Sequence, residues 1–407
     1  MKSRAISRRR MLRQSTVLGL GTALLPQLRA KAANKPPSKV HGIKVVSLRS
    51  NHYHGWPTLA RRHNGQLLLV CSGGREMHVC PFGQVELMRS DDDGKTWTFP
   101  RVVLDLAIDD RDAGILETTR GSLLATTFSS LAYEHYFRDG EINNWDAARQ
   151  ARWRGAHQRI SEAERKTQLG TWMLRSTDGG VTWSTPYDSI VNSPHGPIQL
   201  ADGRQLYAGK DLSKSGQWIG VCESIDDGKS WRKLAQIPTR PGDNPAEYHE
   251  LHAVEAVNGT LVVQIRNHNS ANSRETLQTE STDGGKTWSV PHPINVWGLP
   301  SHLLRLRDGR LLMSYGHRRK PFGNQARIST DHGKTWDEPV TISGDGANGD
   351  LGYPSTVELQ DGTLLTAWYE QMSSRPRAVL RLAKWSLLQR RGRRSPRPLG
   401  RRREPGV

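Results

Sequence analysis

The sequence predicts an all-β chain folded as a six-bladed β-propeller, and two interleaved repeats carry this prediction. The first repeat is an eight-residue pattern, S-x-D-x-G-x-[ST]-W, which occurs five times along the chain. The second is a tight turn containing glycine between two short apolar stretches, and it occurs six times. A unit that returns about every 50 residues is typical of propeller blades built from four strands. We therefore expect one blade for each glycine turn.

The eight-residue pattern has the chemistry of a tight turn. Aspartate accepts hydrogen bonds from the backbone ahead of it, glycine adopts positive φ, and serine or threonine hydroxyls add local bonds. The closing tryptophan can pack between neighbouring sheets. The five copies are Ser90 to Trp97, Ser176 to Trp183, Ser224 to Trp231, Ser281 to Trp288 and Ser329 to Trp336.

The glycine turns have the pattern of β-hairpins, because apolar, β-prone segments such as 67–70 and 261–263 flank them. If the strands of a blade are named A to D from the centre outward, this turn joins A to B and the eight-residue pattern joins C to D. Both turns then lie on one face, the bottom, and A-strand starts meet B-strand ends on the opposite, top face. The sixth blade has no eight-residue pattern and ends in the strand-like segment 378–383. The turns are Asn64-Gly65, Arg120-Gly121, Asp202-Gly203, Asn258-Gly259, Asp308-Gly309 and Asp361-Gly362.

The longest interval between two copies of the pattern predicts a helical insert, residues 131–170, in blade two. Segments 145–153 and 160–165 are helix-prone and highly charged. The insert lies between strands B and C, so we expect it to rise over the top face. A substrate lid, a partner-docking element and a simple surface excursion remain alternatives.

Both ends of the chain differ from its body in composition. Residues 1–32 contain twin arginines, an apolar stretch and the small-residue exit Ala30-Lys31-Ala32. They predict a Tat-type signal peptide and a periplasmic or secreted protein. No later segment is apolar for long enough to span a bilayer, so we expect no stable membrane insertion. Residues 389–407 predict a basic disordered tail. This leaves 40–388 for the propeller.

The strongly basic composition does not indicate a nucleic-acid partner. Most of the formal net charge of +18 lies in the two ends of the chain, so the predicted propeller is nearly neutral. The three cysteines are too few for a disulfide framework. Cys71 and Cys80 can pair in an oxidising compartment, which would leave Cys222 unpaired, and free buried thiols are an equal alternative.

Charged and imidazole side chains concentrate at the strand ends of the predicted top face. Their joint position there indicates a site better than any one of them does. No pair has the spacing of a metal motif on a single element, so we expect no metal ion and no other cofactor. The residues of interest are His54, Arg75, His78, Arg111, Asp112, Glu250, His252, Arg266, Arg318 and Tyr353.

The eight-residue pattern is identified as the Asp box of the sialidase (neuraminidase) family, which the chain resembles over nearly the whole predicted propeller. The segment 249–255 followed by Arg266 is similar to the family's strand pair with an activating glutamate and a carboxylate-binding arginine, and it matches Glu250 to that glutamate. The segment 352–355 resembles the surroundings of the family's nucleophilic tyrosine, which implies this role for Tyr353. Arg75 resembles the family's second arginine.

The chain also departs from the family pattern. Gly55 lies where the family has its first arginine, and residues 76–82 contain no aspartate to match the family's acid/base group. His78 lies near that position and can protonate a leaving oxygen. Arg318 and Arg319 both lie on the loop expected for the third arginine, and we take Arg318 as the candidate. Arg111 can rebuild the missing clamp or can form a structural bridge to its flanking aspartates.

The resemblance implies an exo-acting glycoside hydrolase for an acidic sugar, sialic acid or a relative, on a glycan or glycoconjugate. A tyrosine nucleophile is a known exception to the usual carboxylate pair of glycosidases. A uronic-acid lyase and a non-catalytic carbohydrate-binding propeller are the alternatives, and we expect a monomer. The implied catalytic residues are Tyr353, Glu250 and His78, and the implied substrate-binding residues are Arg75, Arg266, Arg318, Arg111, Asp112, His54 and His252.

Overall fold

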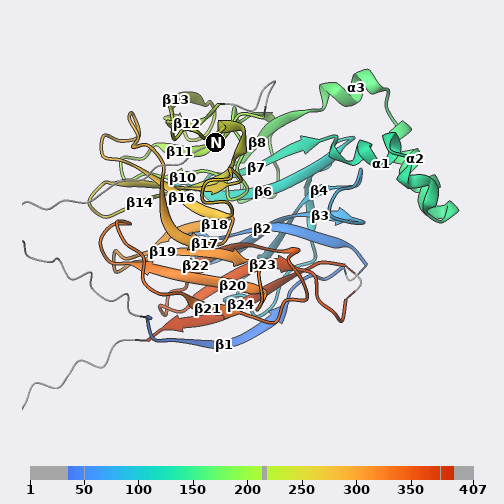
Figure 1. Ribbon diagram of the computed structural model, residues 1–407. Helices are drawn as coiled ribbons and strands as arrows, with labels where there is room; N and C mark the ends of the chain where they lie inside the picture. Colours follow the sequence, from blue (N-terminus) through green and yellow to red (C-terminus); the bar gives the residue numbers. More distant parts are fainter. Residues whose placement is uncertain (1–34, 50, 213–217, 376, 389–407) are drawn as a thin grey trace, which may run out of the picture. The chain divides into compact units, whose positions relative to one another are not determined.

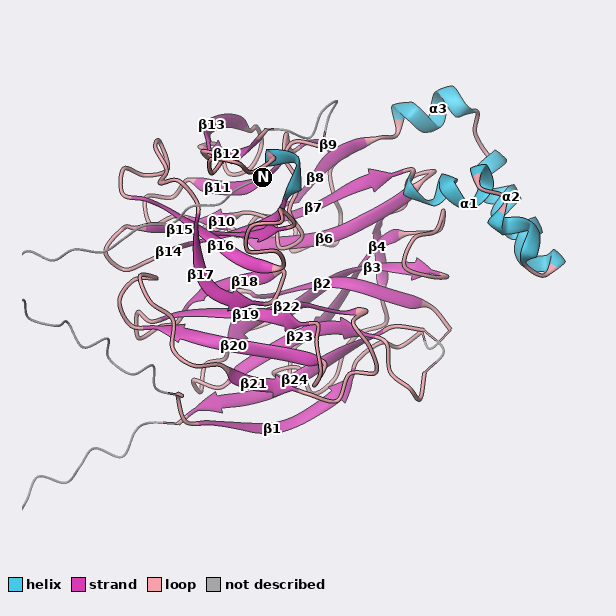
Figure 2. Ribbon diagram, in the orientation of Figure 1, coloured by secondary structure: helices cyan, strands magenta, loops and turns pink. Residues whose placement is uncertain are grey.

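The computed structural model describes residues 35–49, 51–212, 218–375 and 377–388 (Figure 1). These residues form six antiparallel sheets of four strands, which confirms the predicted six-bladed propeller (Figure 2). The predicted signal peptide and basic tail lie outside the described residues. Within the described part of the chain, no helix has both the length and the apolar character needed to cross a membrane.

Five blades consist of four consecutive strands each, with the innermost strand first. Blade one contains β2 (Tyr53–Arg61), β3 (Leu67–Arg75), β4 (Gln84–Ser90) and β5 (Arg101–Leu104). Blade two contains β6 (Asp109–Glu117), β7 (Leu123–Ser130), β8 (Gly170–Ser176) and β9 (Tyr187–Asp188). Blade three contains β10 (Ile198–Gln199), β11 (Gln205–Lys210), β12 (Ile219–Ser224) and β13 (Arg232–Gln236). Blade four contains β14 (Tyr248–Glu255), β15 (Leu261–Asn267), β16 (Glu275–Ser281) and β17 (His292–Trp297). Blade five contains β18 (Ser301–Arg305), β19 (Leu311–His317), β20 (Gly323–Ser329) and β21 (Val340–Ser343).

Blade six is shared between the two ends of the chain. Its inner strands are β22 (Leu351–Glu358), β23 (Leu364–Glu370) and β24 (Val379–Leu387), and its outermost strand is β1 (Ser38–Val45). The pairing of β1 with β24 runs from Ser38 opposite Leu387 to Val45 opposite Arg381, as the blue and red strands of Figure 1 show. The sequence analysis had not assigned β1. Backbone hydrogen bonds between the two chain ends therefore close the ring.

The Asp boxes need two successive left-handed residues, which explains their composition. In the third box, Asp227 has φ 66° and Gly228 has φ 78°. The Ser224 hydroxyl donates to Asp226 Oδ1 at 2.8 Å and accepts from the Gly228 N–H at 2.9 Å. Aspartate and glycine tolerate this conformation better than most residues do. The pattern therefore specifies a turn rather than a catalytic site.

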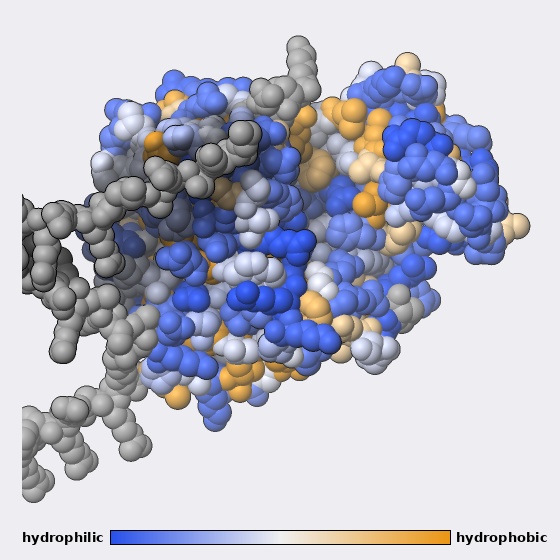
Figure 3. All heavy atoms as spheres, in the orientation of Figure 1, coloured by the Kyte–Doolittle hydropathy of each residue, from blue (hydrophilic) through white to orange (hydrophobic). Residues whose placement is uncertain are grey.

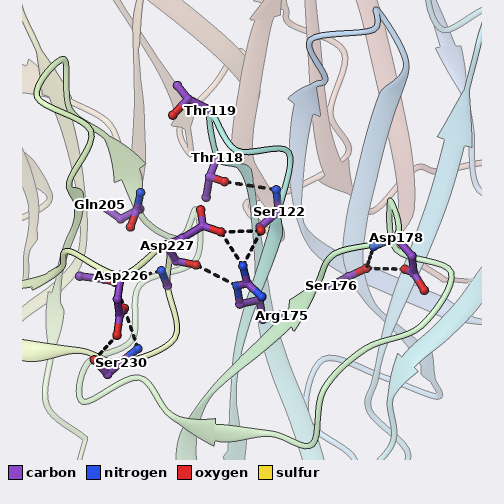
Figure 4. A network of polar contacts seen from close by, with 12 residues as sticks. Thr118, Thr119, Ser122, Arg175, Ser176, Asp178, Gln205, Asp226, Asp227 and Ser230 are labelled. Carbon is purple, nitrogen blue, oxygen red and sulfur yellow. Dashed lines mark hydrogen bonds and ion pairs between the residues drawn. The ribbon is translucent and has the colours of Figure 1, made fainter.

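A network on the bottom face ties blade three to blade two (Figure 4). The Asp227 carboxylate accepts hydrogen bonds from Ser122 Oγ at 2.6 Å and from Arg175 Nη2 at 2.5 Å. Arg175 Nε also donates to the Asp227 carbonyl oxygen at 2.9 Å. Ser122 follows the glycine turn of blade two, so this turn and the Asp box of the next blade share one face, as strand alternation predicted.

The apolar core lies between neighbouring blades. Leu68 and Val70 of β3 pack against Ala113 and Ile115 of β6, and Trp183 of the second Asp box contacts the same cluster. Burial of apolar surface of this kind stabilises a fold by about 25 cal/mol per Å². Each blade therefore depends on its neighbours for its core.

The insert leaves blade two between β7 and β8, as expected. Asp146 caps α2 by accepting a hydrogen bond from the Arg149 N–H, and Ser161 with Glu164 forms a capping box at the start of α3. The insert elements are η1 (Ala132–Glu134), α1 (His135–Arg138), η2 (Glu141–Asn144), α2 (Ala147–Gln158) and α3 (Glu162–Thr167).

The insert is docked on blade one. Trp153 of α2 is buried with Cys80 and Ile108, and its indole N–H donates to Glu76 at 3.2 Å. Arg149 forms an ion pair with the same carboxylate at 2.5 Å. Figure 3 shows hydrophobic surface at the junction between insert and blades, on a face that is otherwise mostly hydrophilic. The insert therefore braces the loop between β3 and β4.

All three cysteines are free, buried thiols. Cys71 belongs to the core of blades one and six, whereas Cys80 packs beneath the insert. The fold therefore has the second of the two alternatives, without a Cys71–Cys80 disulfide.

Candidate active site

The innermost strands of four blades carry the same irregularity near their start. The pairing of β2, β6, β14 and β22 with the second strand of each blade shifts register there. A bulge of this kind re-aims a side chain, and left-handed backbone at a non-glycine residue costs on the order of 1–3 kcal/mol. Strain repeated at corresponding positions marks these residues as functional candidates. They are Trp56 (φ 52°), Asp112 (φ 50°), Glu250 (φ 42°) and Tyr353 (φ 52°).

Tyr353, Glu250 and Arg266 form one hydrogen-bonded cluster. The Tyr353 hydroxyl donates to Glu250 Oε1 at 2.5 Å. Arg266 Nη1 donates to Glu250 Oε2 at 2.5 Å and to the Tyr353 hydroxyl at 3.0 Å. The structure thus brings together residues of blades four and six that the sequence analysis had selected by their place at strand ends and by the family resemblance of their segments.

The electrostatics of this cluster separate the roles of its two acids. Burial alone would raise the pKa of Glu250, but the charge and hydrogen bond of Arg266 outweigh it and hold that pKa below its ordinary value. Burial, followed by the charge of Glu250, raises the pKa of Tyr353 well above 10. Glu250 is therefore a carboxylate that can accept a proton from a neutral phenol.

Arg318 adds a second guanidinium beside Tyr353. Its Cζ lies 5.6 Å from the centre of the Tyr353 ring, and its Nε donates to the Leu351 carbonyl at 2.9 Å. Its Nη2 is buried without a hydrogen-bond partner. Arg318 therefore has donor capacity left for a ligand.

Arg75 does not join the cluster. Its side chain is fully buried and forms a bidentate ion pair with Asp109, at 2.6 and 2.9 Å. Arg75 Nη2 also donates to the His78 carbonyl at 2.8 Å. Both terminal nitrogens are thus engaged within the protein, and the geometry favours a structural role over the substrate contact that the resemblance implied.

Arg111 also faces inward. Its Nη1 lies 3.7 Å from Asp109, and its Cζ lies 4.4 Å from the centre of the Trp56 ring. The bridge is to Asp109 rather than to the flanking Asp110 or Asp112. Trp56, which follows the position of the missing family arginine, is almost completely buried and also contacts Arg75 and Tyr353. A tryptophan therefore fills the blade-one side of the site.

Asp112 carries a carboxyl group with unused hydrogen-bonding capacity. The side chain is buried and its Oδ1 has no partner. Burial raises its pKa to about 7; Arg111 opposes the shift, whereas Glu250 adds to it. The charge of Asp112 in turn raises the pKa of Tyr353. Asp112 is therefore a carboxylic acid that holds a proton near neutral pH, close to the Tyr353–Glu250 pair.

His78 is oriented by a carboxylate that the sequence analysis missed. Its Nδ1 lies 3.2 Å from Asp350 Oδ1, which also accepts a hydrogen bond from the Tyr369 hydroxyl at 3.0 Å. The Tyr53 hydroxyl donates to the same carboxylate at 3.0 Å. Because the carboxylate only accepts, His78 Nδ1 carries the proton and Nε2 keeps its lone pair. Partial burial lowers the pKa of His78, and Asp350 offsets this only in part.

The contacts of His54 and His252 are with other groups of the protein than Tyr353. His54 is buried against Glu86, and burial lowers its pKa to about 4. His252 packs with His195 and His302, at ring distances of 5.3 and 4.6 Å, and accepts the Leu303 N–H at 2.9 Å. Both histidines are held within the protein rather than presented to a ligand.

One group of side chains has the composition of a metal site. Glu247, His249 and His268 bring three potential ligand atoms within 4.8 Å of one another, although the sequence analysis expected no metal ion. Arg266 Nε donates to His268 Nε2 at 2.9 Å, and Lys210 Nζ lies 3.5 Å from His249 Nδ1. The positive charges of Arg266 and Lys210, which contact these two imidazoles, would repel a metal cation bound there.

A pocket of about 540 Å³ opens beside the cluster, between blades four and five. Arg266 and Arg318 belong to its wall, together with Arg274, Trp297 and Leu299. Its volume lies within the range of roughly 300–1,000 Å³ that is usual for small-molecule sites. The sequence analysis missed Arg274 because it considered only A-strand starts and B-strand ends.

Comparisons with known proteins agree with this architecture. A sialidase from Paraclostridium sordellii is 22% identical over 213 residues, which cover 44% of this chain and 52% of the relative. A xyloglucanase from a Paenibacillus species is 29% identical over 227 residues, which cover 48% of this chain and 21% of the relative. The chain thus spans about half and about a fifth of the lengths of these two relatives.

Solved structures share the fold. A protein of unknown function from Dyadobacter fermentans superposes with a TM-score of 0.71 at 21% identity, covering 87% of this chain and 100% of the other. A Hadza microbial sialidase gives 0.59 at 17% identity, covering 81% and 65% of the two chains. A Trypanosoma rangeli sialidase in a covalent-intermediate complex with 2,3-difluorosialic acid superposes with a TM-score of 0.56 at 15% identity. The superposition covers 82% of this chain and 54% of the other. The family defined by the BNR repeat-like domain matches residues 156–366, and the chain therefore belongs to this family, as a sialidase-like propeller with Asp boxes.

Proposed function

We propose that this protein is a glycoside hydrolase that removes an acidic sugar, sialic acid or a relative, from the end of a glycan. The observation that carries the proposal is the 2.5 Å hydrogen bond from the Tyr353 hydroxyl to Glu250. The sialidase from Paraclostridium sordellii and the Trypanosoma rangeli complex support the substrate class. Export by the predicted signal peptide would place the enzyme among extracellular glycans.

Tyr353 is the nucleophile in this mechanism. Its oxygen forms a bond to the anomeric carbon while its proton passes to Glu250 Oε1, and the bond to the leaving oxygen breaks. A neutral phenol approaches a substrate that carries a carboxylate without the repulsion that a carboxylate nucleophile would meet. Arg266, which donates to both partners, holds them in line during the transfer.

Asp112 is the proton donor to the leaving oxygen. Its carboxyl group is protonated near neutral pH and has an unpartnered Oδ1, whereas the Nδ1 proton of His78 is held by Asp350. After the leaving group departs, the Asp112 carboxylate takes a proton from the water that attacks the glycosyl-tyrosine. Glu250 then returns its proton to Tyr353, which restores both residues.

A lyase is the second candidate, and the His78–Asp350 pair favours it. A neutral His78 Nε2 can abstract a carbon-bound proton next to a uronic carboxylate, and the Tyr353 hydroxyl can protonate the leaving oxygen. The product of this elimination carries a new double bond that absorbs in the ultraviolet, unlike the product of hydrolysis. Product absorbance on a panel of acidic glycosides therefore separates the two reactions.

The test of the hydrolase compares Tyr353→Phe and Glu250→Gln with the wild-type protein on the cleaved glycoside. We expect kcat to fall about 10²–10⁴-fold in Glu250→Gln, and at least as far in Tyr353→Phe because no nucleophile remains. Tyr136→Phe, in the insert, is the matched control and keeps wild-type turnover. Full activity of Tyr353→Phe would contradict the mechanism, and binding of acidic sugars without turnover by the wild type would favour a non-catalytic carbohydrate-binding protein.

A further inference from the structure

The insert holds the chain segment that leads into β6. Arg159, which follows α2, donates from Nε to the Ala107 carbonyl at 3.1 Å and from Nη2 to the Leu106 carbonyl at 3.0 Å. The next residue, Ile108, is fully buried in one cluster with Trp153 of α2. The helices of the insert lie beyond the ends of β6 and β7 (Figure 1). The insert therefore fixes the approach to β6 through hydrogen bonds to its backbone and through apolar packing.

Blade one holds the start of β6 from the other side. The Leu106 N–H donates to Asp110 Oδ2 at 2.7 Å, which ties the segment held by the insert to the strand. The Asp110 N–H donates to the Gly83 carbonyl at 3.0 Å, and the Asp110 carbonyl accepts from Ser72 Oγ at 2.6 Å. The backbone is thus fixed between the insert and blade one two residues before Asp112.

Asp112 needs such support because its conformation is costly. It has φ 50° and lies where the pairing of β6 with β7 shifts register. Strained backbone of this kind persists only when the surrounding structure holds it in place. Asp112 is also only 6% exposed. A looser start of β6 would let the bulge relax and would let water reach the carboxyl group.

We propose that the insert positions the proton donor of the site, because Arg159, through segment 106–108 and the start of β6, keeps the Asp112 carboxyl group buried and directed at the leaving oxygen. This inference rests on the proposed function, which assigns proton donation to Asp112. It gives the insert a role in catalysis that differs from those of a substrate lid and of a partner-docking element. Arg159 is a positioning residue, since it acts on the reaction through Asp112.

The first test compares Arg159→Ala with the wild type on natural and nitrophenyl glycosides. Arg159 is exposed, so the variant should fold, which thermal unfolding verifies. A displaced Asp112 protonates the leaving oxygen less well, so kcat/KM on natural glycosides at low pH should fall roughly 10-fold, and on nitrophenyl glycosides within about twofold. Hydration of the carboxyl group lowers its pKa, so the pH above which kcat/KM declines should move down by about one unit.

A second measurement needs no turnover. Asp112→Asn is introduced into the wild type and into Arg159→Ala, and the free energy of unfolding is measured in urea at pH 4 and pH 8. In the wild type, this substitution should stabilise the protein more at pH 8, because the buried carboxyl group ionises as the pH rises. The gain in stability should be smaller in Arg159→Ala, where water reaches the carboxyl group.

Arg154→Ala is the matched control, because it removes an exposed arginine of the same helix whose Nη2 donates to Asn143 Oδ1 within the insert, at 2.9 Å. It should keep the wild-type values in both measurements. A wild-type pH profile in Arg159→Ala, an undiminished gain in stability, or equal shifts in the two arginine variants would each overturn the proposal. Absent turnover in the wild type, together with a smaller gain in Arg159→Ala, would contradict the hydrolase and support the positioning of Asp112 by the insert.

Discussion

Replacement of Asp112 by asparagine should separate its role in catalysis from its cost to stability. The carboxyl group has an ordinary pKa of 3.8, and burial raises it to about 7 in the folded protein. Folding therefore favours the protonated form of the Asp112 carboxyl group, and ionisation of this group destabilises the folded protein. Stability that is fully present below about pH 4 is lost as the pH rises through about 7. Asparagine cannot ionise, so Asp112→Asn does not lose this stability as the pH rises.

The size of this effect follows from the pKa shift. One pKa unit corresponds to about 1.4 kcal/mol, so ionisation of Asp112 costs the folded state on the order of 4 kcal/mol at pH 8. The free energy of unfolding of Asp112→Asn, relative to the wild type, should increase by this amount between pH 4 and pH 8 in urea titrations. The charged groups that act on Asp112 are Arg111, Glu250, Arg75 and Arg266.

The same substitution predicts a change in the pH profile of turnover. The kcat/KM of the wild type should fall as the pH rises through about 7, because the general acid must be protonated. At low pH, the kcat/KM of Asp112→Asn on natural glycosides should be about 10²–10⁴-fold below that of the wild type. The descending limb of the pH profile should be absent from this variant. On nitrophenyl glycosides, whose leaving groups need little protonation, the kcat/KM of Asp112→Asn should fall much less.

Asp110→Asn provides the matched control. Burial also raises the pKa of Asp110 to about 7, but this carboxylate accepts hydrogen bonds from the Leu106 N–H and from Ser129 within the protein. Asp110→Asn should therefore alter the pH dependence of stability without removing the limb from the activity profile. If Asp112→Asn keeps the wild-type limb, or if both aspartate variants lose it equally, the assignment of Asp112 as the proton donor is wrong.

Two further substitutions test other parts of the structure. Asp350→Asn removes the carboxylate that accepts the His78 Nδ1 proton. We expect less than a tenfold loss in hydrolysis on the same glycosides, and a much larger loss would show that the His78–Asp350 pair takes part in the hydrolysis. Asp227→Ala leaves Arg175 and Ser122 without their acceptor on the bottom face; it should lower the free energy of unfolding by about 3 kcal/mol in denaturant titrations, with kcat unchanged. A change in kcat without a change in stability would contradict the structural role of that Asp box.

The repeats predicted the blades because their chemistry is local. An Asp box is satisfied by its own serine, aspartate and glycine, so each copy is recognisable without knowledge of its neighbours. Strand alternation then placed Glu250, Arg266 and Tyr353 on one face, and the structure joins them. The outer strand of blade six was missed because β1 carries no repeat signal and pairs only with the far end of the chain.

The remaining features of the site depend on contacts between blades, which a single strand does not reveal. Arg75 ends β3 as predicted, but Asp109 at the start of the next blade holds its guanidinium in an ion pair. The role of Asp350 likewise depends on its contact with His78, which lies in another blade. The bulges at Trp56 and Asp112 are set by how the inner strands pair, and no residue type in the sequence marks them.

Ring closure by β1 also fixes where attachments to the propeller begin. The Leu388 N–H donates to the Pro37 carbonyl at 2.8 Å, so both ends of the described propeller lie next to each other. β24 runs toward the bottom face and β1 starts there, on the side away from Tyr353. A tether, an affinity tag or a fused module at either end would therefore start behind the pocket. Such an attachment would leave the mouth of the site free to meet bulky glycans.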